Sequence, residues 1–163
     1  MTDLYAEHAL GLVRLAVIML GDQAAAEDVV QDAFLSLYRR WDSLADTSQP
    51  LAYVRVSVLN GCRSALRSQS RLGQSWHGLA AALSQPPSES AEARVLLTEE
   101  HRAVVGAIRR LPERQREALL LRYYLDMSED ETARTMGVAR GTVKSATSRA
   151  LAAIRRILKE DSQ

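Results

Sequence analysis

The residues best suited to bind a charged partner lie in one stretch near the end of the chain, "GVARGTVKSATSRALAAIRR", residues 137–156. The stretch is basic and contains no acidic residue. On a helix, four of its polar residues fall on one face and two more stand at the N-terminal end. These are Lys144, Ser145, Ser148 and Arg149 on the face, and Arg140 and Thr142 at the end. Cations bind phosphates and small hydroxyls can approach base edges, so the pattern predicts a DNA-binding surface.

The charge of the whole chain is divided unevenly. Residues 1–50 carry three Arg and eight Asp or Glu, whereas residues 101–163 carry 13 Lys or Arg and eight acids. The formal net charge of the 163 residues is only +1, so the balance hides two oppositely charged ends. This polarity indicates two modules with different partners. A composition rich in Ala, Leu, Arg and Glu favours an all-α fold.

The break between the modules lies in residues 68–92, "SQSRLGQSWHGLAAALSQPPSESAE". Two glycines, a Pro-Pro pair and several serines predict a mostly flexible linker, with a short helical turn over residues 79–83. The predicted organisation is a domain over residues 1–68, a linker over 69–91 and a domain over 92–163. Each domain is near the small end of what folds alone.

The first domain is predicted to hold helices over residues 5–20, 23–41 and from Pro50 to about residue 68. Gly21 ends the first helix, and Asp22 is the N-cap of the second. The second helix has an apolar face and an opposite face with Glu27, Asp28, Gln31 and Asp32. The third helix carries Arg63 and Arg67 outside. The acidic and basic faces therefore belong to different helices.

The second domain is predicted to contain a helix-turn-helix. A helix over residues 91–110 is followed by one that starts at Pro112 and closes at Asp126 and Met127. Ser128 and Glu131 then match a capping box, and Gly137 can end the helix that they begin. A final helix starts about three residues later and runs to about residue 159. Two helices joined by a tight turn with glycine form this motif.

Several classes of function find no support in the sequence. No segment is apolar over the roughly 18 residues of a membrane span, and no signal peptide is recognised. The three histidines share no ligand spacing, so we expect no metal. No cofactor motif and no nucleophile with a placed base are found, so we expect a protein that is not an enzyme. The single cysteine, Cys62, fits a reducing cytoplasm and is interpreted as a buried apolar residue.

Three stretches carry a resemblance to a known family. "LPERQREALLLRYYLDMSEDETARTMGVARGTVKSATSRALAAIRRIL" resembles the promoter-recognition domain of small extracytoplasmic-function (ECF) sigma factors of bacterial RNA polymerase, in the actinobacterial-type subset. "GDQAAAEDVVQDAFLSLYRRW" is similar to their core-polymerase-binding helix, and "AYVRVSVLNGCRSALRSQSR" to the helix that opens the −10 element. The motifs occur in family order and span nearly the whole chain.

The resemblance implies roles for particular residues. Asp28, Gln31, Asp32 and Phe34 would contact the clamp coiled coil of the largest subunit of the polymerase core. Asn60 would capture a flipped base of the −10 element, with Arg63 and Arg67 near the backbone. Arg140, Thr142, Lys144, Ser145, Ser148 and Arg149 would read the −35 element. The implied partners are core polymerase, promoter DNA and an anti-sigma factor, without cofactor or membrane insertion.

Other interpretations remain open at this point. The chain could be a polymerase-independent helix-turn-helix regulator whose first domain dimerises or senses; such a regulator does not need the acidic helix. Phe34 could be a core residue instead of a contact, and Asn60 could cap a local kink. Trp76 in the linker could anchor a partner or plug a domain. Ala139 is a poor N-cap for the last helix.

Overall fold

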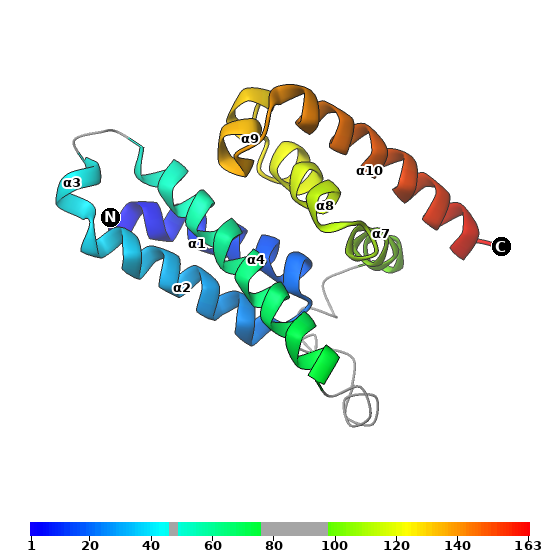
Figure 1. The fold of residues 1–163 in the computed structure, drawn as a ribbon, viewed down its shortest axis with the longest axis horizontal. Helices are drawn as coiled ribbons and strands as arrows, with labels where there is room; N and C mark the ends of the chain where they lie inside the picture. Colours follow the sequence, from blue (N-terminus) through cyan, green and yellow to red (C-terminus); the bar gives the residue numbers. More distant parts are fainter. Residues whose placement is uncertain (46–48, 76–97) are drawn as a thin grey trace. The chain divides into compact units, whose positions relative to one another are not determined.

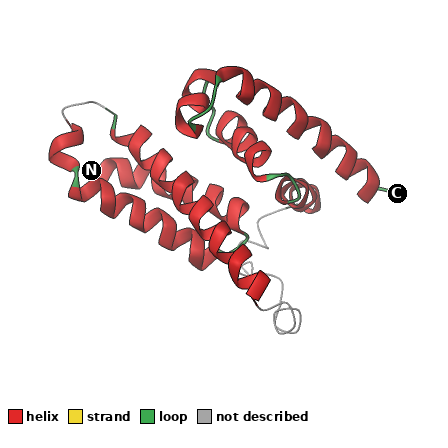
Figure 2. Ribbon diagram, in the orientation of Figure 1, coloured by secondary structure: helices red, strands yellow, loops and turns green. Residues whose placement is uncertain are grey.

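The computed structural model describes residues 1–45, 49–75 and 98–163. Contacts divide the chain into two compact units, Met1–Ser90 and Ala91–Gln163. Helices make up the described parts of both units, and no strand occurs in these ranges (Figure 2). The prediction of an all-α fold is thereby confirmed. The predicted linker lies mostly outside the described residues, as does Trp76, so the domain limits stay a prediction.

The first unit is built on three long helices, α1 (Thr2–Leu20), α2 (Gln23–Arg39) and α4 (Pro50–Ser75), which pack against one another (Figure 1). Gly21 ends α1 in the left-handed conformation, with φ 72°, and Asp22 caps α2 by accepting a hydrogen bond from the Ala25 N–H. Both caps agree with the sequence prediction. Buried residues from all three helices form the core: Leu12, Leu15, Met19, Val30, Phe34, Leu37, Val54, Val58, Leu59 and Cys62.

Two helix ends in this unit differ from the prediction. Helix α2 stops at Arg39, and a separate short helix, α3 (Trp41–Ala45), follows. Arg40 leaves the helical conformation, and its carbonyl accepts hydrogen bonds from the backbone and the hydroxyl of Ser43. Helix α4 continues to Ser75 instead of ending near residue 68. Gly73 costs only about 1 kcal/mol relative to Ala, which is too little to end the helix.

The second unit contains α7 (Glu99–Arg109), α8 (Glu113–Leu119), the π-helical turn η1 (Leu120–Tyr124), α9 (Glu129–Met136) and α10 (Arg140–Asp161). Thr98 caps α7, and residues 91–97 of the predicted helix lie outside the described residues. Helix α10 contacts α7, α8 and α9. Leu111, Leu119 and Ala150 form a buried cluster with Ile108 and Ile154 beside it. The long α10 is thus held from one side by the rest of its unit.

The π-helical turn is the main feature of this unit that periodicity did not predict. It replaces the last turn of the helix expected from Pro112, and Asp126 follows with a positive φ of 51°. Aspartate tolerates this conformation better than most residues other than glycine. Met127 is buried just after it, so the segment closes where the sequence predicted.

Candidate functional sites

The turn between α9 and α10 is built by local hydrogen bonds. The Ser128 hydroxyl accepts from the Glu131 N–H at 3.1 Å, and the Glu131 carboxylate accepts from the Ser128 N–H at 2.8 Å. The predicted capping box is confirmed. At the other end, Gly137 takes φ 68° and the Val138 N–H bonds back to the Ala133 carbonyl. These contacts set the direction in which α10 leaves the turn, as the helix-turn-helix prediction requires.

Helix α10 has a buried side and an exposed side. Val143, Thr147, Ala150 and Ile157 are buried, and the Thr147 hydroxyl donates to the Val143 carbonyl at 2.7 Å. The exposed side holds the predicted polar set, which we call the recognition face: Thr142, Lys144, Ser145, Ser148 and Arg149. It offers cations and small hydroxyls together on a rigid helix. Such a surface can bind phosphate and approach base edges.

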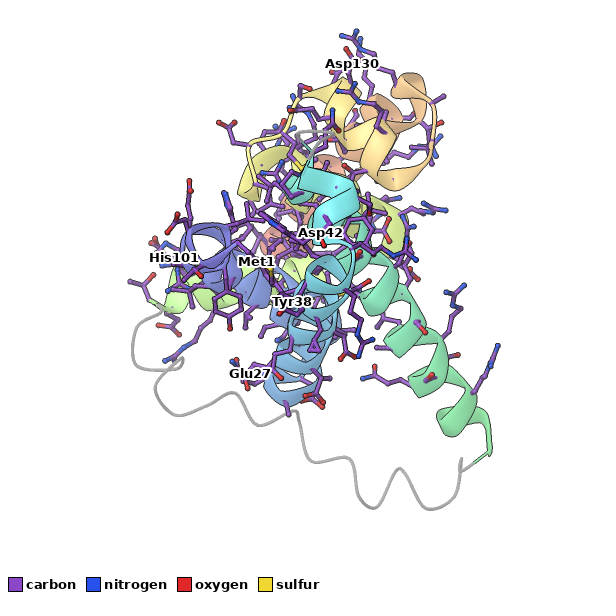
Figure 3. The ribbon with its side chains drawn as sticks, turned by 90° about the vertical axis from the view of Figure 1, so that its left-hand side faces the viewer. Met1, Glu27, Tyr38, Asp42, His101 and Asp130 are labelled. Atoms are coloured by element: carbon purple, nitrogen blue, oxygen red, sulfur yellow. The ribbon has the colours of Figure 1, made fainter. Side chains whose placement is uncertain are left out.

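Arg140 is exposed but engaged within its own unit. Its Nε donates to Glu129 Oε2 at 3.0 Å, and its Nη1 lies 3.5 Å from Asp130 Oδ1. The hydrogen bond from Arg140 is the main cause that lowers the pKa of Glu129, with the positive charges of Arg122 and Lys144 adding to it. Asp130 stands at the end of the unit in Figure 3. Arg140 is therefore part of a charged cluster with the first turn of α9.

A shallow basic groove of about 340 Å³ extends the recognition face along α10. Arg149 and Arg156 line it from α10, and Arg110 and Gln115 line it from the α7–α8 region. Arg110 is bound to both carboxylate oxygens of Asp161 at 3.2 Å. The sequence prediction did not include Arg156 in the site. The seven-residue spacing from Arg149 places both on one side of the helix and could have indicated it.

The acidic side of α2 is exposed as predicted, except for one residue. Asp28, Gln31 and Asp32 face solvent. Phe34 does not: it is only 3% exposed, and its ring meets the edge of Tyr5 with centroids 4.9 Å apart. Its side chain is therefore a core residue, the alternative that the sequence left open. We therefore assign Phe34 to the core that supports α2, and not to the contact surface.

Two apolar residues beside the acids were missed by sequence reasoning. Leu35 is 46% exposed and Tyr38 is 70% exposed, and Figure 3 shows Tyr38 on α2. They continue the series from Asp28 through Gln31 at helical spacing, a signal that the sequence already contained. We call Asp28, Gln31, Asp32, Leu35 and Tyr38 the α2 face. Exposed aromatic and aliphatic groups next to charges are typical of protein interfaces.

The predicted −10 residues lie on α4. Asn60 is exposed, and its Oδ1 accepts from Arg63 Nη1 at 3.3 Å. Arg67 is exposed one turn further on. Asn60 lies in the interior of α4 and not at one of its ends. The structure brings Asn60 and Arg63 together.

Asn60 also borders a shallow groove between α2 and α4, with a volume of about 480 Å³. Polar residues from both helices line part of it, namely Asp32, Ser36, Ser57 and Ser64. The helices approach closely here, since a Cβ on Gly61 would lie 2.7 Å from a Val29 methyl carbon. Asp32 and Asn60, predicted to have different partners, therefore share one groove.

In the described ranges, no group of three or more His, Cys, Asp or Glu residues is arranged to hold a metal ion. No helix among the described residues is long and apolar enough to cross a membrane. Cys62 is buried, in agreement with its interpretation as an apolar core residue. Together, the fold and the surfaces define a two-unit, helix-turn-helix protein with one basic and one acidic face.

Comparison with known proteins gives this class a family. Residues 4–72 match sigma-70 region 2, and residues 101–154 match sigma-70, region 4. The chain is 31% identical over 165 residues to the ECF RNA polymerase sigma factor SigL of Mycobacterium tuberculosis, covering 98% of this chain and 89% of SigL. It is 35% identical over 146 residues to the probable RNA polymerase sigma factor RfaY of Xanthomonas campestris, covering 86% of this chain. The chain spans only 36% of the length of RfaY.

A solved structure shows the same fold. The sigma factor RpoE of Bartonella quintana, in complex with the anti-sigma factor NepR, superimposes with a TM-score of 0.77 at 26% identity. The alignment covers 98% of both chains. The chain belongs to the ECF sigma factors of bacterial RNA polymerase.

Proposed function

We propose that this chain binds the core of RNA polymerase through its first unit and directs it to promoters through both units. One observation carries the proposal: the same chain has two exposed surfaces of opposite charge. The α2 face is acidic and apolar, and the recognition face on α10 is basic. A sigma factor needs both surfaces. A polymerase-independent regulator needs only the second, so this alternative is not favoured. The chain acts by binding, without a catalytic group.

The α2 face is the proposed contact with the clamp coiled coil of the largest core subunit. Asp28, Gln31 and Asp32 offer negative charge and hydrogen bonds to a basic partner, which gives orientation and speed of association. Leu35 and Tyr38 offer the apolar area that supplies most of the affinity in such contacts. Phe34 holds α2 in place from the core.

The exposed edge of α4 is the proposed reader of the −10 element. A base taken out of the stack costs a few kcal/mol, which contacts in the protein must offset. Because Arg63 donates to the Asn60 oxygen, the Asn60 amide nitrogen is left as donor to a base edge. Arg67, one turn beyond Arg63, adds a cation for the phosphate backbone. The shallow groove beside Asn60 gives such a base a place to enter.

The recognition face is the proposed reader of the −35 element. Lys144 and Arg149 supply phosphate or guanine contacts, and Ser145 and Ser148 allow the helix to enter the major groove closely. Thr142 and Arg140 stand at the N-terminal end of α10, the end that meets base edges in this motif. The basic groove with Arg156 extends the surface toward neighbouring phosphates.

We extend two further features of the family to this chain. The Bartonella relative is held by an anti-sigma factor, and we propose a protein inhibitor of the same kind as a partner here. Since the polymerase works in the cytoplasm, we place the chain there, where a lone thiol stays reduced.

Transcription in vitro tests the proposal. Core polymerase with and without the chain is given genomic DNA from the source bacterium, and the 5′ ends of the transcripts are sequenced. We expect new start sites that share two upstream sequence elements and appear only when the chain is present. An unchanged set of start sites, with the chain still binding DNA, would favour the regulator instead.

A further inference from the structure

Arg140 differs from the cations of the recognition face in what it touches. Its guanidinium uses Nε for Glu129 at 3.0 Å and directs Nη1 toward Asp130 at 3.5 Å. Lys144 and Arg149 form no ion pair of this kind with an acid of α9 among the contacts of the described residues. A phosphate that bound Arg140 would meet a guanidinium whose Nε and Nη1 already face carboxylates, and whose charge these acids largely offset.

The acids that Arg140 meets lie where a helix-turn-helix approaches the DNA backbone. Helix α9 is the first helix of the motif, which crosses the backbone while the second enters the groove. Its first turn carries Glu129, Asp130 and Glu131, and Glu131 is occupied in the capping box. The other two carboxylates would repel a nearby phosphate. A cation that stays on them removes that repulsion.

The same contact also holds the turn together. Ala139 is the N-cap of α10 and makes no side-chain cap, so the start of α10 lacks the usual local hydrogen bond. The pair between Arg140 and Glu129 links the first turn of α10 to the first turn of α9. Glu129 is only 29% exposed in its side chain, so the pair is partly shielded from solvent.

We propose that Arg140 is a positioning residue that stays paired with Glu129 and Asp130 when DNA is bound. It neutralises the acidic start of α9 and fixes the α9–α10 turn, while Lys144 and Arg149 make the phosphate contacts. The inference rests on the proposed function, because it assumes that the recognition face binds DNA. It changes the role of Arg140 from a residue that contacts the −35 element to a support of the DNA-binding surface.

The test measures DNA binding by the full chain with fluorescence anisotropy at several salt concentrations. The probe is a 30-bp duplex, a length of about three helical turns, selected from a random library by the unaltered chain. R140Q should weaken binding by about three- to tenfold. This is the effect expected when two carboxylates, Glu129 and Asp130, repel nearby phosphates without a cation between them. The slope of log K against log salt should change by well under the roughly 0.9 units of one phosphate contact.

The triple variant R140Q/E129Q/D130N decides between the two roles. If Arg140 acts mainly by neutralising the acids, removing them as well should restore most of the affinity that R140Q loses and keep the salt slope near that of the unaltered chain. If Arg140 is a phosphate ligand, the salt slope of the triple variant falls by about 0.9 units, whatever affinity the removal of the acids returns. That second result would overturn the inference.

Two controls complete the experiment. K144Q should weaken binding and lower the salt slope by about 0.9 units; if it changes nothing, the proposed DNA-binding face is wrong and the inference falls with it. The second control measures the pKa of the Glu129 carboxylate by NMR in the unaltered chain, so it does not depend on any variant folding. This pKa should remain lowered with DNA bound, and a return to the ordinary range on binding would also overturn the inference.

Discussion

Phe34 and Leu35 are adjacent in sequence and have opposite environments. Phe34 is buried against Tyr5, whereas Leu35 faces solvent with Tyr38 one turn further on. Consecutive helical residues point in different directions, so a motif match at one position does not tell which neighbour a partner meets. In the proposed contact with the polymerase core, Leu35 and Tyr38 supply apolar area and Phe34 supplies support.

The first prediction at this scale concerns Tyr38. Tyr38→Ala should lower the affinity for core polymerase by about 5- to 30-fold, because an exposed aromatic at the centre of a contact often dominates it. Leu10→Ala on α1 is the matched control, since Leu10 is also 61% exposed but lies outside the α2 face. Surface plasmon resonance with immobilised core compares the two. Equal losses, or no loss for Tyr38→Ala, would remove Tyr38 from the contact.

The second prediction concerns pH. The Arg140 hydrogen bond lowers the pKa of Glu129, so the folded state favours the charged carboxylate. The contribution of this pair to the stability of the folded state is therefore complete at pH values above the ordinary glutamate pKa. It is lost as the pH falls through the lowered pKa of Glu129. Carboxyl NMR should show Glu129 titrating below the other glutamates in the unaltered chain and returning toward the ordinary range in Arg140→Gln. An unchanged midpoint in the variant would contradict the pair.

At the scale of elements, helices α2 and α4 cross at Gly61. No side chain fits there, because an added Cβ would meet a Val29 methyl carbon at 2.7 Å. Valine is stiff about its first side-chain bond and cannot readily turn away. The close crossing sets the distance between the α2 face and Asn60, and so the width of the groove that they share.

Substituting alanine at two glycines should have opposite effects. Gly61→Ala should destabilise the first unit by about 1–2 kcal/mol, because overpacking outweighs the gain in helix propensity. Gly11→Ala on α1, with nothing within 4 Å of the added Cβ, should stabilise it by about 0.5–1 kcal/mol. Urea unfolding of the full chain measures both. A stabilising Gly61→Ala would mean that the helices separate easily at this point.

The two helix starts of the helix-turn-helix give a further prediction. Ser128→Ala should destabilise the second unit by about 1 kcal/mol, since it removes half of the capping box. Ala139→Ser should stabilise it by up to about 1 kcal/mol, because residue 139 already has the extended backbone of an N-cap. Thermal unfolding followed by circular dichroism provides the measurement. If Ser128→Ala leaves the stability of the second unit unchanged, tertiary packing alone sets the turn.

Some helix ends were predictable from the sequence and others were not. Caps with a chemical signature, at Gly21, Asp22, Ser128 and Gly137, were predicted correctly because each depends on a few adjacent residues. The break at Arg40, the extension of α4 and the π-helical turn were not, because each depends on hydrogen bonds or packing that periodicity does not encode. The same limit applies to the site. The recognition face followed from spacing, but the pairing of Arg140 with Glu129 required the fold.

At the scale of the molecule, the charge division of the sequence corresponds to two surfaces on two units. Acids gather on α2 of the first unit, and exposed cations gather along α10 of the second. A nearly neutral chain can thus present opposite charges to a protein and to DNA. Each surface is carried by a separate helical core, so a substitution on one should leave the other intact.

Binding of purified core polymerase by the full chain tests this division most directly. Asp32→Arg should abolish co-purification with core, while the chain keeps its affinity for duplex DNA. Lys144→Gln should weaken DNA binding and leave co-purification with core unchanged, and Glu7→Arg on α1 should change neither. We expect this crossed pattern if the two surfaces bind separate partners. Core binding unaffected by Asp32→Arg, or DNA and core binding lost together in either variant, would contradict it.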